Sequence, residues 1–468
     1  MFRYLLVLLT LASGAAAAID RTKRPEPDPA PAASFPDYKT QTLPNGLKVF
    51  VIEDDRKPTI TFRLLIKSGS INDGAKTGLS GFVAGLLNRG TEKRDAATFA
   101  AESDYLGVKV EAVSGPDAIA VSAGGMTKYT DKILDLLSDA VLHPVFPEEQ
   151  FAKEQRRALS ALESEKQEPE SLAEKLKGKL VFGAHPYGAY RTPETVTSIR
   201  RDDIAAFHHA WFTPNNATLA VVGDVQADQI LPLVEKAFAE WKQREVPIEK
   251  HAALPRMHGR SVHLVDRPGS VQSNIIVAEP GPARNNPDVP ELNVTNATLG
   301  GGFSGRLFQN LRERHGWTYG AYSAFGMLRE GGEFTAEAQT RNAVTAPAIE
   351  ETLKEMQRLR DERVPEAELD LQRQYNVGNY LLSLENSGRI AQRVQDIDLY
   401  GLPADFYKTY ARRMGATTSA MVQELAKKYI DTENLAIVVV GEAKDVKDEL
   451  EKLGKLYLYD QQLKLVGP

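Results

Sequence analysis

The sequence contains no cysteine among its 468 residues. Disulfide bonds, cysteine-ligated zinc and a thiol nucleophile are therefore excluded. An excess of positive charge is also absent, because 57 Lys and Arg against 63 Asp and Glu leave a formal net charge of -6. Proteins that bind nucleic acid or an anionic membrane usually have a basic surface, so we expect neither partner.

Long apolar runs are missing too, apart from one at the N-terminus. Arg3, the apolar run 4–11 and the three alanines at 16–18 follow the order of a secretory signal peptide. A membrane anchor would need about 20 apolar residues, which this run does not reach, and no later run could span a bilayer. Residues 1–18 are therefore predicted to direct export and to be removed, and a bacterial periplasm is the expected compartment. Residues 19–37, rich in proline, are predicted to be a disordered tether.

The rest of the chain contains an internal repeat. NATLAVVGDV, which begins at Asn216, is echoed by NLAIVVVGEA, which begins at Asn434, at a spacing of 218 residues. We therefore predict two homologous halves, 38–241 and 261–468, joined by a charged linker at 242–260. In each half strand patterns precede long helical patterns. This order predicts the α+β class, with a mainly antiparallel sheet covered on one face by helices.

One predicted helix has an unusual composition. In GLSGFVAGLLNRGT, residues 78–91, apolar side chains recur at helical spacing, so one face of the helix is expected to be buried. Gly81 and Gly85 nevertheless lie on consecutive turns of this helix. A glycine inside a helix costs about 1 kcal/mol relative to alanine, so the two glycines require an explanation.

Three motifs together resemble peptidase family M16, the pitrilysin-type or inverzincin zinc peptidases. They are LPNGLKV at 43–49, the helix that leads into RGT at 89–91, and LGGGFSGRLFQNLRERHGWTYGAYSAF at 299–325. The similarity runs from about Tyr38 to beyond Val440. The length and the linker resemble those of the two-domain members, which work as pairs of chains. The resemblance implies a role in peptide hydrolysis.

The resemblance also implies where a zinc site would lie. The family's His-x-x-Glu-His motif supplies two imidazole ligands and a general base, and a later carboxylate completes the ligand set. Four positions of this sequence correspond to that set, and none of their side chains can bind a metal: Gly81, Ala84, Gly85 and Ala161. The two helical glycines are thus interpreted as vacated ligand positions.

No other part of the sequence offers a replacement site. Glu154 is retained, but Glu163 follows Ala161 by two residues and should point about 200° away on a helix. The eight histidines form no zinc motif, and the neighbours His208 and His209 diverge by about 100° on a predicted helix. No Gly-x-Ser-x-Gly elbow is present, although composition alone leaves a Ser-His-Asp site open. We expect no cofactor in this chain and zinc in a partner subunit.

Two residues of the family's second-half motif are retained, Arg312 and Tyr319. The resemblance implies that both bind the substrate main chain and that Tyr319 helps to stabilise the oxyanion of peptide-bond attack. Alternatively, Arg312 forms a surface ion pair and Tyr319 packs in a core. Arg306 is predicted to be structural, and glycines 300–302 are predicted to allow close backbone approach.

Three functions remain open at this stage. The first is a non-zinc-binding subunit of a heterodimeric zinc metallopeptidase, in which Arg312 and Tyr319 act on peptides held by a homologous partner with an intact His-x-x-Glu-His motif. The second is a catalytically inert peptide-binding or scaffold protein of the same fold. The third is an autonomous hydrolase with an unrelated site, for which we expect little activity and no stoichiometric zinc.

Overall fold

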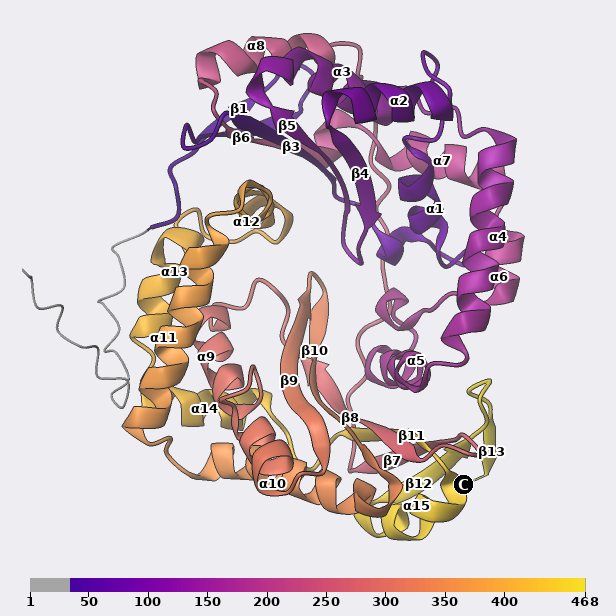
Figure 1. Ribbon diagram of the computed structural model, residues 1–468, viewed down its shortest axis with the longest axis vertical. Helices are drawn as coiled ribbons and strands as arrows, with labels where there is room; N and C mark the ends of the chain where they lie inside the picture. The colour runs from indigo at the N-terminus through magenta and orange to yellow at the C-terminus, as the bar shows by residue number, and fades with distance from the viewer. Residues whose placement is uncertain (1–33, 468) are drawn as a thin grey trace, which may run out of the picture. The chain divides into compact units, whose positions relative to one another are not determined.

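The computed structural model describes residues 34–467. The predicted signal peptide and most of the predicted tether lie outside this range. Two mixed sheets carry the fold (Figure 1). The six-stranded sheet has the order β1 (Lys39–Thr42), β2 (Lys48–Glu53), β6 (Ala217–Gly223), β3 (Thr59–Ile66), β5 (Ile119–Met126) and β4 (Lys109–Ser114). The seven-stranded sheet has the order β13 (Leu465–Gly467), β12 (Lys455–Tyr459), β7 (Ser261–Asp266), β11 (Ala436–Gly441), β8 (Gln272–Gly281), β10 (Gly331–Arg341) and β9 (Thr318–Leu328).

The two sheets repeat one topology. The order β2-β6-β3-β5-β4 in the first matches β7-β11-β8-β10-β9 in the second. In each, one central strand is parallel to the first of these strands and antiparallel to the next, β6 in one sheet and β11 in the other. β6 and β11 contain the two halves of the sequence repeat. The predicted α+β class and homologous halves are confirmed, with the addition that each sheet contains parallel pairs.

Helices fill the segments between the strands. Those of the first half are α1 (Leu79–Leu86), α2 (Ala96–Leu106), α3 (Thr130–Leu142), α4 (Glu148–Glu165), α5 (Pro169–Phe182), α6 (Pro193–Ser198), α7 (Arg201–Trp211) and α8 (Ala227–Ala237). Those of the second half are α9 (Val289–Leu299), α10 (Thr345–Asp361), α11 (Glu366–Ser383), α12 (Ser387–Leu399), α13 (Phe406–Gly415), α14 (Ser419–Tyr429) and α15 (Ala443–Leu450). α3 and α8 cover one face of the first sheet, and α10 and α15 cover one face of the second (Figure 1).

Each sheet also receives one helix from the other half. α12 packs on β3 and β6, and α5 packs on β8 and β11. Because side chains alternate along a strand, β6 buries Leu219 and Val221 in its own half, whereas Ala220 and Val222 join the cluster that contains Val394 of α12. This double covering explains why every residue of β6 and of β11 is buried. The prediction of helices on one face alone is therefore incomplete.

Polar contacts reinforce this exchange of helices. Gln395 of α12 is fully buried, and its amide donates to the carbonyl oxygens of Arg63, at 2.8 Å, and of Thr218, at 3.0 Å. Lys177 of α5 is also buried and forms an ion pair with Glu333 of β10 at 2.6 Å. Both contacts reach from a helix of one half to a strand of the other. The two halves are thus joined by more than the linker.

The stretch 242–260 contains no helix or strand. Its side chains pack against both halves. Val246 packs against the first-half core and Arg244 donates to the carbonyl of Phe212, whereas Leu254 and Met257 pack against the cluster that contains Val438 and Val440. Among the described residues, no helix combines the length and the hydropathy needed to cross a membrane. The predicted domain boundaries at 241 and 261 stay a prediction.

Candidate functional site

The helix α1 begins at a tightly held turn. Gly78 precedes its first residue with a φ of 103°, a left-handed conformation that favours glycine. The buried carboxylate of Asp73 accepts hydrogen bonds from the backbone N–H groups of Gly78 and Ser80, both at 2.7 Å. Burial raises the pKa of Asp73 to about 6, although these two donors act in the opposite direction. Asp73 therefore fixes the start of the helix that carries Gly81, Ala84 and Gly85.

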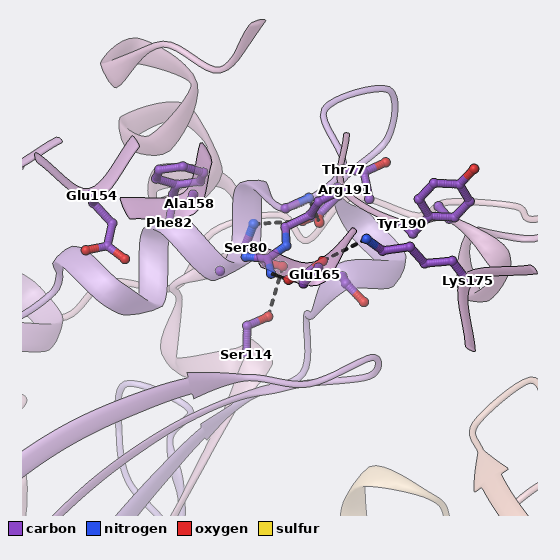
Figure 2. A pocket seen from close by; sticks show the side chains of 15 residues that line it. Thr77, Ser80, Phe82, Ser114, Glu154, Ala158, Glu165, Lys175, Tyr190 and Arg191 are labelled. Atoms are coloured by element: carbon purple, nitrogen blue, oxygen red, sulfur yellow. Dashed lines mark hydrogen bonds and ion pairs between the residues drawn. The ribbon is translucent and has the colours of Figure 1, made fainter. Parts of the chain in front are cut away.

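A cavity of about 420 Å³ opens beside this helix (Figure 2). Gly81 lines it, and a Cβ atom added to Gly81 would have no neighbour within 4 Å. Close packing therefore does not require glycine at this position. Ala84 is buried, and Gly85 lies next to Glu154, whose Oε1 would be 3.8 Å from an added Cβ. The first glycine faces open space where the resemblance places a metal ligand.

The opposite wall of the cavity comes from α4, which packs against α1. Glu154, Ala158 and Glu165 line the cavity, and Ala161 lies on the same stripe of the helix, three residues after Ala158. Ala161 itself is exposed and offers no ligand. Glu163 points elsewhere, as expected, because it is exposed and pairs with Lys166 at 2.6 Å.

Two side-chain cations occupy the cavity wall beside α1. Glu165 pairs with Lys175 at 2.7 Å and with Arg191 at 3.2 Å, as Figure 2 shows for the labelled residues. Arg191 also packs over the start of α1, because a Cβ on Gly78 would lie 2.9 Å from its Cδ.

No imidazole lines this cavity, and its three carboxylates already have partners. Asp73 accepts from the backbone of α1, Glu154 pairs with Arg157 at 3.4 Å, and Glu165 pairs with the two cations. The residues present do not fit zinc.

The cavity residues Glu165, Lys175 and Arg191 were not predicted from the sequence. Glu165 follows Ala161 by four residues, which places it on the same face of α4. That spacing is the signal that could have identified it. Lys175 and Arg191 come from α5 and from the segment before α6, and no spacing in the sequence connects them to α1.

The second-half motif begins with close backbone packing. A Cβ on Gly300 would lie 2.6 Å from the backbone N of Ser323, and one on Gly301 would lie 2.7 Å from Cα of Ala297. Larger residues would force the loop away from α9 and β9. Arg306 is buried and forms two hydrogen bonds with Glu368, at 2.7 and 3.2 Å. The structure thus agrees with close approach at the glycines and with a structural Arg306.

Arg312 lies in a π-helical segment, Phe308–Arg314. The N–H of His315 donates to the carbonyl of Asn310, five residues earlier, at 3.1 Å. The amide of Asn310 is held in turn by Glu351 and Glu355 of α10, both at 2.8 Å. Single π turns inside helices frequently occur at functional sites. This one gives the backbone of Arg312 a fixed support.

Tyr319 lies at the start of β9, close to Arg312. The guanidinium carbon of Arg312 is 5.5 Å from the centroid of the Tyr319 ring, and the tyrosine is 83% exposed. Within residues 34–467, neither the guanidinium of Arg312 nor the hydroxyl of Tyr319 has a hydrogen-bond or ion-pair partner. Within these residues Arg312 therefore forms no ion pair, and Tyr319 does not pack in a core, as the alternative interpretation of the sequence required. None of the cavity-lining residues near Gly81 comes from this motif.

Three histidines, His208, His185 and His251, make hydrogen bonds within the fold. His208 is buried on α7, and its Nε2 donates to the carbonyl of Val141 at 2.8 Å, while burial lowers its pKa to about 4. His185, His251 and Glu330 have possible ligand atoms within 4.8 Å of one another. However, the N–H of Tyr187 donates to Nδ1 of His185 at 3.2 Å, so the neutral ring carries its proton on Nε2.

That proton is directed at Glu330, at 3.1 Å, and Nδ1 of His251 lies 3.0 Å from the same carboxylate. Burial acts to raise the pKa of Glu330, but the hydrogen bonds from His185 and His251 lower it below its ordinary value. The cluster is a hydrogen-bonded junction between the linker, the first half and the β9–β10 turn. A metal ligand at His185 would require the opposite tautomer.

Comparison with known proteins now decides the family. The family model described as "Insulinase (Peptidase family M16)" matches residues 48–188, and that described as "Peptidase M16 inactive domain" matches residues 198–376. The chain belongs to peptidase family M16. The earlier identification from the three motifs is confirmed.

Relatives and solved structures agree with this M16 assignment. An uncharacterized zinc protease of Bacillus subtilis (strain 168) is 25% identical over 353 residues, which covers 75% of this chain and 85% of the relative. Another uncharacterized zinc protease, from Streptomyces coelicolor, is 24% identical over 412 residues and covers 86% of this chain and 89% of the relative.

Two solved structures share the M16 fold with this chain. The peptidase M16 inactive domain from Pseudomonas fluorescens superposes with a TM-score of 0.81 at 24% identity, over 86% of this chain and 98% of that one. A protease from Helicobacter pylori superposes with a TM-score of 0.82 at 21% identity, over 86% and 99%.

Proposed function

We propose that this M16 chain is the non-zinc-binding subunit of a heterodimeric metallopeptidase. In that assembly a homologous partner with an intact His-x-x-Glu-His motif carries zinc and the general base. This chain contributes Arg312 and Tyr319 to the binding of peptide substrates and to oxyanion stabilisation. Export to a bacterial periplasm, directed by residues 1–18, is part of the proposal.

One observation supports this division of labour above others. The ligand positions on α1 and α4 are empty of donors and have paired cations beside them, whereas Arg312 and Tyr319 are accessible and unpaired within the described chain. Arg312 is half-buried and contacts the Tyr319 ring, but within the described residues its guanidinium has no hydrogen-bond or ion-pair partner, and its placement on a supported π turn is consistent with a contact outside the chain.

The chemistry of the two side chains suits a peptide backbone. Guanidinium is a permanent cation with several donors in a fixed plane, which matches a row of carbonyl oxygens. A phenol can donate to an oxygen that becomes negative during attack, and one such preorganised donor is worth roughly 3 kcal/mol. The same segments present exposed aromatic rings, with Phe303 71% and Tyr322 41% exposed, which offer contact area for substrate side chains.

The decisive experiment measures peptide cleavage by the reconstituted pair of chains. Arg312→Ala and Tyr319→Phe are each expected to lower kcat/KM by about a hundredfold without preventing pair formation. Arg314→Ala serves as the matched control, because Arg314 is exposed in the same π-helical segment. For the tyrosine, the control is Tyr105→Phe, which changes an 86% exposed tyrosine on α2.

Wild-type rates in both site variants would refute the role of Arg312 and Tyr319 in hydrolysis. If the chain then still bound peptides, the inert peptide-binding or scaffold function would replace the proposal. The gene next to that of this chain offers a quick discriminator. An adjacent exported M16 chain with His-x-x-Glu-His favours the heterodimer.

A further inference from the structure

A second cavity, of about 430 Å³, is lined by residues of α11, α12 and α13 and by Arg284, and it shares no lining residue with the cavity beside α1. Its charged lining is unbalanced. Three arginines line it, Arg284, Arg389 and Arg393, against the single carboxylate of Asp396. The rest of its lining is polar or phenolic and contributes no further negative charge.

Within residues 34–467, none of these three arginines lies within ion-pair distance of a carboxylate. Arg284 donates from Nη2 to the hydroxyl of Tyr407 at 2.8 Å, and Arg389 donates from Nη1 to Gln392 at 3.2 Å. The guanidinium of Arg393 stacks on the Tyr380 ring at 4.7 Å. One nitrogen each of Arg284 and Arg393, the Nη1 atom, is buried and has no hydrogen-bond acceptor.

Asp396 is the single carboxylate of this lining and offsets the charge of the three arginines only in part. Its carboxylate accepts from the hydroxyl of Tyr407 at 3.1 Å rather than from a guanidinium. Burial raises the pKa of Asp396, against the influence of Arg284, Tyr407 and the neighbouring Arg63. Buried guanidinium groups without an anionic partner are costly, and each unpaired donor adds its own desolvation penalty.

The phenols leave one donor available. Tyr410 accepts a hydrogen bond from the amide of Asn293, so its own proton is not used in that contact. Tyr407, in contrast, accepts from Arg284 and donates to Asp396. A ligand in this cavity would therefore lie against the side chains of Arg284 and Arg393, the exposed guanidinium of Arg389 and the phenol of Tyr410.

We propose that this cavity binds the oxyanion of a small molecule, a carboxylate or phosphate group, through Arg284, Arg389 and Arg393. Guanidinium matches the planar carboxylate and the phosphate face with paired, charge-assisted hydrogen bonds, which are shorter and stronger than neutral ones. The bound anion supplies the negative charge that the cavity lacks. The site is independent of the proposed peptidase role, since none of its residues is Arg312 or Tyr319.

The test is calorimetric titration of the full chain, in chloride buffer of constant ionic strength, with inorganic phosphate and separately with citrate. Saturable binding of at least one is expected. Arg393→Gln and Arg389→Gln should each weaken it by about tenfold, the loss of one charge-assisted contact. Arg389 is exposed, so its variant remains informative if Arg393→Gln does not fold.

Arg412→Gln is the control, because it removes an exposed arginine on α13 that does not line the cavity. Tighter binding of phosphate would identify a phosphorylated ligand, and tighter binding of citrate a carboxylate. The proposal is overturned if neither anion binds, or if Arg412→Gln weakens binding as much as the two cavity variants do.

Discussion

The guanidinium of Arg191 pairs with Glu165 at 3.2 Å on the wall of the cavity into which Gly81 opens. Lys175 binds the same carboxylate at 2.7 Å. The cavity therefore already contains two positive charges, which belong to the side chains of Lys175 and Arg191. The vacated ligand positions thus lie beside two cations that would compete with a metal ion for the carboxylate of Glu165.

Restoring the four residues alone should therefore restore zinc binding only in part. We expect a variant with Gly81→His, Ala84→Glu, Gly85→His and Ala161→Glu to bind zinc weakly. Adding Lys175→Met and Arg191→Met should then raise the affinity by about tenfold, because nearby cations no longer oppose the ion. Competition with a chromogenic chelator measures both affinities.

The control for that experiment adds Lys153→Met and Arg156→Met instead, which removes two exposed cations on another face of α4. An equal gain in this control would show that net charge, rather than the cations beside the cavity, limits the affinity.

Tyr319→Phe should leave the stability of the isolated chain unchanged within about 0.5 kcal/mol, as is usual for an exposed position. The hydroxyl makes no hydrogen bond within the described residues, and the ring keeps its contact with Arg312. Urea unfolding measured in parallel on the wild type and the variant checks this. A loss above 1 kcal/mol would indicate a structural role for the hydroxyl.

Glu279 should make stability depend on pH. This glutamate is 5% exposed on β8, accepts from the N–H of Asp431 at 2.7 Å, and has a pKa raised by burial to about 8. Between its ordinary pKa and 8, the folded chain holds a proton that the unfolded chain has released. As the pH rises through that window, the free energy of unfolding should therefore fall by about 1.4 kcal/mol for each pH unit. Above the window it should become constant.

Glu279→Gln keeps the acceptor for Asp431 and cannot ionise, so it should remove this slope and be the more stable form at pH 8. Denaturant unfolding at pH 5, 6.5, 8 and 9 gives the comparison. Glu350→Gln, at an exposed position of α10, is the control and should retain the wild-type slope. Parallel slopes for wild type and Glu279→Gln would contradict the assignment.

Gln395→Ala should destabilise the chain by about 2–3 kcal/mol, because the carbonyl oxygens of Arg63 and Thr218 lose a buried donor. Thermal unfolding measures the loss. Gln374→Ala removes the same group from an exposed position of α11 and should change little. A loss of similar size at both positions would show that α12 is not specifically held by the first sheet.

Local patterns were enough to predict the fold class, the helix within residues 78–91 and the repeat. The spacing of Asn216 and Asn434 predicted two homologous halves, because each repeat contains a continuous apolar run of the kind found in buried strands. The central position of these strands, and their parallel pairing, come from the structure. The exchange of α5 and α12 was not predictable. Both helices are simply amphipathic in sequence, and nothing in that pattern says which sheet the apolar face will cover.

Only part of the candidate site could be predicted from the sequence. The vacated positions and the pair Arg312 and Tyr319 were identified by motif and fixed spacing. Lys175 and Arg191 come from segments distant from α1, so their meeting at Glu165 depends on tertiary packing alone. The π-helical segment that contains Arg312 was not predictable either, because seven residues are too few to show a distinct hydrophobic period.

α5 of the first half covers the second sheet, and α12 of the second half covers the first sheet. Neither half of the chain should therefore fold alone. A fragment cut at residue 250 would leave Ala220 and Val222 open to water, and its complement would lose the cover over Val438 and Val440. Each piece expressed by itself should aggregate, whereas both produced together in one cell should reassemble. Each half therefore depends on the other for the cover of its central strand.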